Sequence, residues 1–157
     1  MATLSVSSGD YIRPASSMGE IRHYGEGASQ TFKLGDPVIF GSDSDEEDLI
    51  KIAGSDPGAI VGFAGEAASG TKGTKLPVYV GDTEFVVRVA DGQAIDVNML
   101  KAAGYGIVAD GTNNIWRLDT SETSAKIFKV RRLVDAHGDV NGRVIAVILR
   151  AERENEL

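Results

Sequence analysis

The sequence of 157 residues contains no cysteine and only two histidines, His23 and His137. The absence of thiols excludes disulfide bonds, thiolate zinc sites, iron–sulfur clusters and cysteine nucleophiles. Two histidines in separate parts of the chain argue against a metal centre built on imidazoles. We therefore expect neither a metal site nor a bound cofactor.

Long apolar runs are absent as well. No run approaches the roughly 18 residues that cross a membrane, and the N-terminus lacks a basic start followed by an apolar segment. Apolar residues make up 42% of the chain and charged residues 25%, as in soluble globular proteins, and the length favours about one domain. These features predict a soluble protein that is made in a cytoplasm and has no membrane partner.

Positive charge is scarce in one stretch. The net charge is −7, and residues 36–70 contain eight acidic side chains with Lys51 as their single basic one. Because no broad basic surface is indicated, no nucleic-acid partner is expected. The five acids of residues 43–48, which we call the acidic loop, could supply oxygen ligands to a cation, although the EF-hand register is absent and a solvated loop is the default expectation. These acids are Asp43, Asp45, Glu46, Glu47 and Asp48.

Glycine, in contrast, is abundant at 19 residues, against four prolines. Short apolar runs separated by turn residues continue from Phe32 to Arg150, and this pattern is typical of a turn-rich β protein. Two of these runs flank Gly81-Asp82, which predicts a β-hairpin at that point. Residues 127–134 and 143–150 form the last and longest strand pair.

One short helix is predicted from about Asp91. Ile95, Met99 and Ala102 recur at helical spacing, and Gly104 suits a helix end. The expected fold class is therefore mainly β, a small β-barrel or β-tulip-like domain with one short helix.

The first 31 residues differ from the rest because their apolar side chains are scattered singly. Such a segment cannot bury enough surface by itself to offset its ordering entropy, but it could do so against a partner. We expect an extended N-terminal arm over residues 1–31, a β domain over residues 32–150 that folds without the arm, and a C-terminal tail over residues 151–157. The arm's larger apolar side chains are Tyr11, Ile12, Met18, Ile21 and Tyr24.

The strand over residues 143–150 is apolar on both faces. Such a strand lies centrally in a β structure or against another subunit. A basic cluster precedes it, in which regular alternation would place Lys129 and Arg131 on one face and Arg132 on the other. The candidate subunit-interface residues are Arg131, Arg132, Ile145, Val147 and Leu149.

Two motifs resemble catalytic ones but lack required parts. Residues 65–72 have the glycine spacing of a phosphate-binding loop, but the terminal pair is Thr71-Lys72 and Pro77 prevents a following helix. Asp119-Thr120-Ser121 resembles the aspartic-protease turn, which needs two carboxylates that share a proton. The apolar-Gly segment that braces such an Asp loop is not evident, so a polar turn at a strand end, in which Asp and Thr side chains satisfy local backbone groups, is the default expectation. We expect no catalytic residues and therefore no enzyme or small-molecule substrate.

Two groups of short elements, one in the first half of the domain and one in the second, match the order found in a known protein family. The second group consists of residues 105–111, Trp116 and residues 140–144. The elements of the first group are Leu34-Gly35-Asp36-Pro37-Val38, Leu49-Ile50-Lys51-Ile52, Ala59-Ile60-Val61-Gly62-Phe63-Ala64 with Ala67-Ala68, and Leu76-Pro77-Val78-Tyr79-Val80 before Gly81-Asp82-Thr83-Glu84-Phe85. Together they resemble the head decoration (cement) proteins of lambda-like tailed bacteriophages over roughly residues 32–149.

The resemblance implies a small β-barrel or β-tulip, usually trimeric, on the outer surface of the expanded capsid. It implies the major capsid protein as partner, synthesis in the host bacterial cytoplasm, and an arm that contacts the capsid lattice through Tyr11, Ile12, Ile21 and Tyr24. Two alternatives stay open, a phage tail or baseplate β module and a retropepsin-like hydrolase that uses Asp119.

Overall fold

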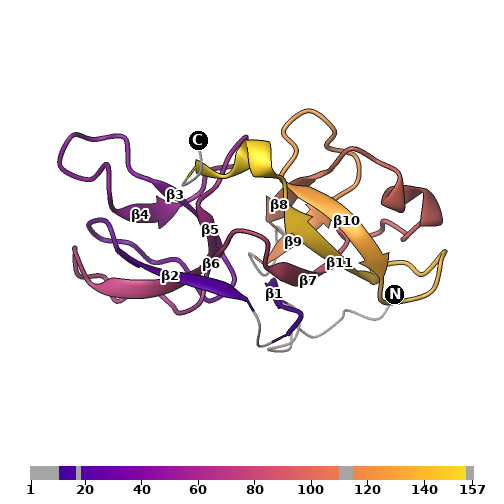
Figure 1. Cartoon of the computed structure of the whole chain (residues 1–157), viewed down its shortest axis with the longest axis horizontal. Helices are drawn as coiled ribbons and strands as arrows, with labels where there is room; N and C mark the ends of the chain where they lie inside the picture. Colours follow the sequence, from indigo (N-terminus) through magenta and orange to yellow (C-terminus); the bar gives the residue numbers. More distant parts are fainter. Residues whose placement is uncertain (1–10, 17–18, 110–114, 155–157) are drawn as a thin grey trace.

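The computed structural model describes residues 11–16, 19–109 and 115–154, and these residues are mainly β (Figure 1). All strand pairs within the sheets are antiparallel. The four-stranded sheet has the order β1 (Arg13–Pro14), β7 (Glu84–Arg88), β11 (Arg143–Ile148), β10 (Phe128–Leu133). The five-stranded sheet has the order β2 (Glu20–Gly25), β6 (Lys75–Val80), β5 (Gly62–Ala64), β3 (Pro37–Phe40), β4 (Ile50–Ile52). A third sheet pairs β8 (Gly106–Ala109) with β9 (Trp116–Asp119).

The mainly β class is confirmed, but the described strands form separate sheets and do not close into a barrel. The expected hairpin across Gly81-Asp82 is wrong, because β6 and β7 belong to different sheets. Gly81 has a φ of 66°, and the Thr83 hydroxyl donates to the Val80 carbonyl at 2.7 Å and accepts from the Glu20 amide at 2.8 Å. These contacts turn the chain from one sheet into the other.

Three aromatic rings join the two larger sheets. Phe63 of β5 stacks on Phe128 of β10 at a centroid distance of 5.2 Å, and it lies 5.0 Å from Phe85 of β7. All three side chains are buried in the main core, which also takes in the inner face of β11. A second core lies on the other face of the five-stranded sheet and consists of Phe32, Val38, Ile50, Val61, Ala64, Leu76, Val78 and Val80. The five-stranded sheet is therefore covered on both faces.

The expected helix is reduced to a single 3₁₀ turn, η1 (Val97–Leu100). Asp96 caps it by accepting a hydrogen bond from the Asn98 amide at 2.7 Å. The helix cannot begin near Asp91, because the backbone of Ile95 bonds instead to Asp139 and Gly138 in the loop between β10 and β11. A second 3₁₀ turn, η2, covers Arg150–Glu152.

The N-terminal segment does not stand apart from the domain over its described residues. All six residues of β2 pair with β6, β1 pairs with β7, and Ile12 is buried in the main core. Alternation of polar and apolar residues in β2 is weak because four of its six residues are exposed. The expectation of a free arm is therefore corrected for residues 11–16 and 19–31, whereas residues 1–10 and Met18 lie outside the described part.

The segment expected as a tail is also docked, as far as residue 154. The Arg153 guanidinium is buried and donates to the Ile148 carbonyl and, at 2.8 Å, to the Asp82 carboxylate. The Phe40 amide donates to the Glu154 carboxylate at 2.8 Å. The side chains of Arg153 and Glu154 therefore hold the residues after η2 against both larger sheets.

Candidate interaction surfaces

The strand β2 forms one edge of the five-stranded sheet (Figure 1). Its outer edge has no strand partner among the described residues. An edge strand of this kind presents backbone N–H and C=O groups to which another extended chain can pair. Ile21 lies on this strand opposite Tyr79 and is 48% exposed. The edge of β2 is therefore a described surface that is suited to strand addition.

The four predicted anchors of the arm have different positions in the structure. Ile12 is buried in the core and is not available to a partner, and Tyr11 is half-buried against Gly35. The Tyr24 ring packs edge-on against Phe40 at 5.5 Å. Ile21 alone among the four is a large, exposed apolar side chain.

Three of the predicted subunit-interface residues, Arg132, Ile145 and Val147, lie on the outer face of the four-stranded sheet. A β-bulge between Val130 and Arg132 shifts the register, so Arg132 faces Ile145 and shares the outer face with Lys129. The expected separation of Lys129 from Arg132 is therefore wrong, because the extra residue, Arg131, breaks the alternation.

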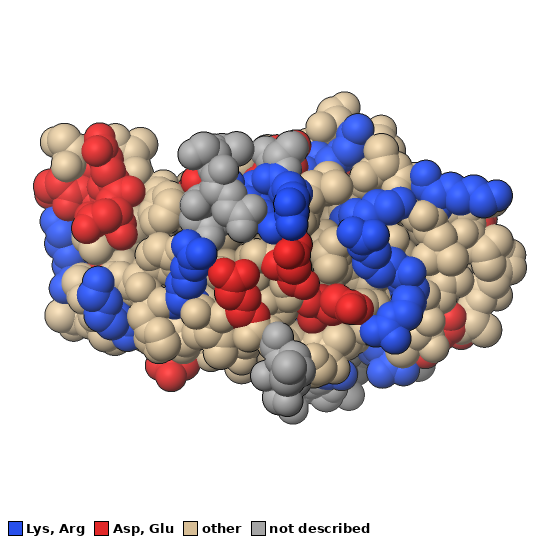
Figure 2. All heavy atoms as spheres, in the orientation of Figure 1, with Lys and Arg blue, Asp and Glu red and all other residues tan. Residues whose placement is uncertain are grey.

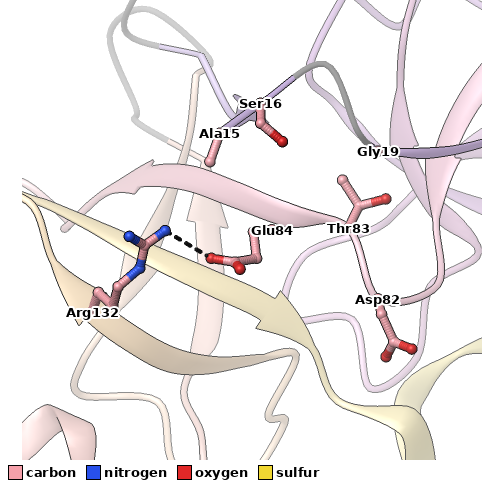
Figure 3. A pocket seen from close by; sticks show the side chains of 7 residues that line it. All are labelled: Ala15, Ser16, Gly19, Asp82, Thr83, Glu84 and Arg132. Carbon is pink, nitrogen blue, oxygen red and sulfur yellow. Dashed lines mark hydrogen bonds and ion pairs between the residues drawn. The ribbon is translucent and has the colours of Figure 1, made fainter.

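Ile145 and Val147 are buried within a single chain. The Arg132 guanidinium of β10 lies 3.1 Å from the Glu84 carboxylate of β7, and β11 runs between these two strands (Figure 3). This ion pair spans the outer face of β11, where Ile145 is 7% exposed and Val147 is 8% exposed. The apolar character of this face therefore does not require a second subunit. Leu149 is half-buried and precedes η2.

The glycine loop between β5 and β6 binds a carboxylate of the chain itself. Glu26 is completely buried and accepts hydrogen bonds from the Ser69 amide at 2.9 Å, the Gly70 amide at 3.0 Å and the Ser69 hydroxyl. Its backbone also pairs with Gly73 and Thr74. The N–H and O–H groups that a phosphate would need are thus already bonded to Glu26. The loop therefore packs against the residue that follows β2.

Sequence reasoning missed the role of Glu26, although one signal was present. Glu26 lies between Gly25 and Gly27, and a Cβ at Gly25 would come within 2.8 Å of the Leu49 side chain. A glycine on each side of an acidic residue lets neighbouring segments come close to the backbone there. Such a pair of glycines indicates that the acidic residue is packed inside the protein and not solvated.

Asp119 belongs to a local turn. Its Oδ1 atom accepts hydrogen bonds from the Ser121 amide and hydroxyl and from the Gln93 side chain, at 2.9, 2.6 and 3.0 Å. Burial tends to raise the pKa of Asp119, but the hydrogen bonds from Ser121 and Gln93 outweigh it and hold the pKa below the usual value. This geometry matches the polar turn at a strand end.

The acidic loop is not uniformly solvated. Glu46 is buried, lies 2.8 Å from Lys51 and accepts a hydrogen bond from the Ala28 amide, and the hydrogen bond from Lys51 lowers the pKa of Glu46. Asp45 pairs with Lys72 at 3.0 Å. Among the described residues no group of His, Asp or Glu side chains is arranged to hold a metal ion. The remaining acids, Asp43, Glu47 and Asp48, are exposed.

A hollow of about 190 Å³ lies where the two larger sheets meet (Figure 3). It is smaller than the roughly 300 Å³ at which ligand pockets begin. Acidic and basic groups face it together, and Arg132 and Glu84 already pair there. Its lining consists of Ala15, Ser16, Gly19, Asp82, Thr83, Glu84 and Arg132.

An ion pair closes the turn between β10 and β11. The Asp135 carboxylate accepts from Nε and Nη2 of Arg143 at 3.0 and 2.9 Å and from the Arg143 amide at 2.8 Å, and these contacts lower the pKa of Asp135. Stability from a lowered pKa is present above the usual aspartate range and is lost as the pH falls through the folded-state value.

We expect Asp135→Asn to lower the free energy of unfolding by about 1 kcal/mol at neutral pH, a modest value because the Arg143 side chain is 38% exposed. Urea titrations at neutral and acidic pH should show the difference from the unmodified protein shrinking in acid. An equal difference at both pH values would show that the carboxylate charge contributes nothing.

A scan against protein-family models gives no match, and no curated protein matches the sequence. Within the described residues, no helix has the length and apolar character needed to cross a membrane.

Proposed function

We propose that this protein is a capsid decoration protein of a tailed bacteriophage. It binds the outer surface of the expanded head, stabilises contacts between major capsid protein subunits and acts without catalysis. It acts as a homotrimer, made in the host cytoplasm and incorporated in the virion. The observation that carries the proposal is the exposed edge of β2, which lies in the N-terminal segment that the family resemblance assigns to the capsid contact.

Most of the resembling motifs fall on one sheet. Those of residues 34–80 supply β3, β4, β5 and β6, and Gly81-Asp82-Thr83 provides the crossing into β7, whereas the later motifs fall on β8, β9 and the start of β11, outside this sheet. Gly62 of β5 has a structural reason to be glycine. A Cβ at this position would come within 2.1 Å of the Tyr79 carbonyl oxygen of β6. Glycine at this position of the motif therefore permits the close approach of β5 to β6, the strand that pairs with β2.

The mechanism combines two weak effects. A strand of the capsid protein pairs with the free edge of β2, and Ile21 gives that contact an apolar anchor. Each contact is modest, but a trimer that spans several capsid subunits converts three contacts into high avidity. Such bridging also resists separation of the capsid subunits.

The proposal is tested by mixing purified protein with expanded, undecorated heads and, separately, with tails, followed by sedimentation. We expect saturable binding to heads and none to tails. Binding to tails alone would favour the tail or baseplate alternative. Binding to neither particle would contradict the proposal.

Ile21→Asp is expected to weaken head binding at least about tenfold, because it removes an apolar anchor and places a charge at the strand edge. The matched control is Val97→Asp on η1, since Val97 is 50% exposed and Ile21 is 48% exposed. Both variants should retain the thermal transition of the unmodified protein. Equal binding by the two variants would exclude the β2 edge as the anchor.

A further inference from the structure

The register of β2 determines which of its backbone groups point to the open edge. In an antiparallel pair, residues that exchange hydrogen bonds alternate with residues that do not. On β6, the Pro77 carbonyl accepts from the Gly65 amide, and the Tyr79 carbonyl oxygen faces β5 as well. The residues opposite these two on β2 are His23 and Ile21, which therefore present their N–H and C=O groups at the outer edge.

The two charged residues of β2 fall between the positions that bond to an added strand. Side chains at such intervening positions approach their partners more closely, because the Cα atoms are about 4.5 Å apart instead of about 5.5 Å. Glu20 and Arg22 lie on one face of β2, opposite Val80 and Val78 of β6. The Arg22 Nη2 atom is 3.3 Å from the Glu20 Oε1 atom, and the two side chains are 51% and 45% exposed. The edge thus offers a partner one negative and one positive charge in a fixed order, with Ile21 between them.

Net charge does not select a partner at this edge. The charges of Glu20 and Arg22 cancel, and Figure 2 shows basic and acidic side chains interspersed with uncharged ones over the region of β2 and β6. The dense group of Asp and Glu at the same end of the molecule lies over the loop between β3 and β4. The order of charges along the partner strand, and not their sum, therefore decides whether the contact is favourable.

We infer that β2 selects an extended segment of another protein that runs antiparallel to it and carries, from N to C, an acidic, an apolar and a basic residue. In this direction the acid lies opposite Arg22, the apolar residue opposite Ile21 and the base opposite Glu20. Antiparallel addition continues the pairing found throughout the five-stranded sheet. Opposite charges that face each other across two strands are favourable and like charges are unfavourable, so the reverse order fits poorly. The inference rests on the strand contact at β2 that we propose for the capsid.

The test compares two short, capped peptides with identical flanks of threonine and valine, one with the centre Asp-Val-Lys and the other with Lys-Val-Asp. Binding to the full-length protein is measured by fluorescence anisotropy. We expect the Asp-Val-Lys peptide to bind at least about fivefold more tightly, because the reversal replaces two favourable charge pairs with two unfavourable ones. In its complex, hydrogen exchange followed by NMR should slow at the Ile21 and His23 amides, which point to the open edge.

A charge exchange within β2 should invert this preference. Glu20→Arg with Arg22→Glu is expected to bind the Lys-Val-Asp peptide more tightly. The matched control is Glu84→Arg with Arg132→Glu, which exchanges an ion pair of the other large sheet at 3.1 Å, with side chains 46% and 66% exposed. This control should keep the original preference, and thermal unfolding verifies that both variants are folded.

Several results would overturn the inference. They are binding of neither peptide, equal binding of both, unchanged exchange at Ile21 and His23, or a preference of the unmodified protein for Lys-Val-Asp, which would indicate parallel addition. β2 itself reads Glu20-Ile21-Arg22, so a second copy is the competing occupant, and self-association that the Asp-Val-Lys peptide does not displace would also overturn it. Head binding without a peptide preference would contradict this inference alone, whereas the expected preference without head binding would contradict the capsid proposal alone.

Discussion

Deletion of residues 1–31 is expected to abolish cooperative folding. It removes β1, the six-residue pairing of β2 with β6, the buried side chain of Ile12 and the Glu26 carboxylate. Loss of a buried Ile alone costs about 2–5 kcal/mol, and the combined loss should exceed about 5 kcal/mol, which is the whole stability of many domains. Thermal unfolding followed by circular dichroism measures the result.

The matched control deletes residues 1–10, which removes none of the contacts described above. This shorter variant should unfold cooperatively at nearly the temperature of the full chain. If the longer deletion also kept a cooperative transition within a few degrees of the full chain, residues 11–31 would be a dispensable arm after all.

Glu26→Ala is expected to lower the free energy of unfolding by about 3 kcal/mol. The substitution removes the acceptor for three hydrogen bonds and leaves the amides of Ser69 and Gly70 without that partner. The glycine loop should then open, and trypsin should cut after Lys72 faster than in the unmodified protein. Urea unfolding and limited proteolysis measure the two effects.

Glu66→Ala is the control for this prediction, because Glu66 is an exposed glutamate in the same loop. Its effect should stay within about 0.5 kcal/mol, as for most surface substitutions. Glu26→Gln should fall between the two, since its amide keeps one acceptor oxygen but turns an NH₂ group toward a donor. Equal stability of Glu26→Ala and Glu66→Ala would show that the buried carboxylate does not hold the loop.

Local sequence patterns were sufficient for several strand pairs. The apolar runs at residues 105–109 and 115–118 predict the hairpin that β8 and β9 form, and those at residues 127–134 and 143–150 predict the pair of β10 and β11, because each pair of runs flanks a turn. In these cases the partners are neighbours in sequence, so composition and spacing carry the information.

Local sequence patterns could not predict contacts between residues that are far apart in the sequence. The Gly81-Asp82 turn has hairpin composition, but the bond from the Glu20 amide to Thr83, 63 residues away, helps to direct the chain into the other sheet. Strand β2 was missed because its exposed edge position allows polar residues on both faces. The position of Arg132 depends on one bulge, which a strict period of two cannot reveal.

The candidate surfaces were predictable only in part. Ile21 was named as an anchor from its side chain alone, and the structure places it on an open edge, whereas the equally apolar Ile12 is buried. The gathering of Arg13, Arg88, Lys129, Arg132 and Arg143 on the outer face of the four-stranded sheet was hidden, because these residues come from four different strands. Sequence therefore supplied candidate residues, and only the fold could sort them into core and surface.

The most direct measurement is an electron cryo-microscopy map of expanded heads saturated with this protein. The account predicts density for a capsid-protein strand beside Glu20–Gly25, continuing the five-stranded sheet, with Ile21 covered at the contact. A map in which β2 faces solvent while another surface of the domain meets the capsid would contradict it.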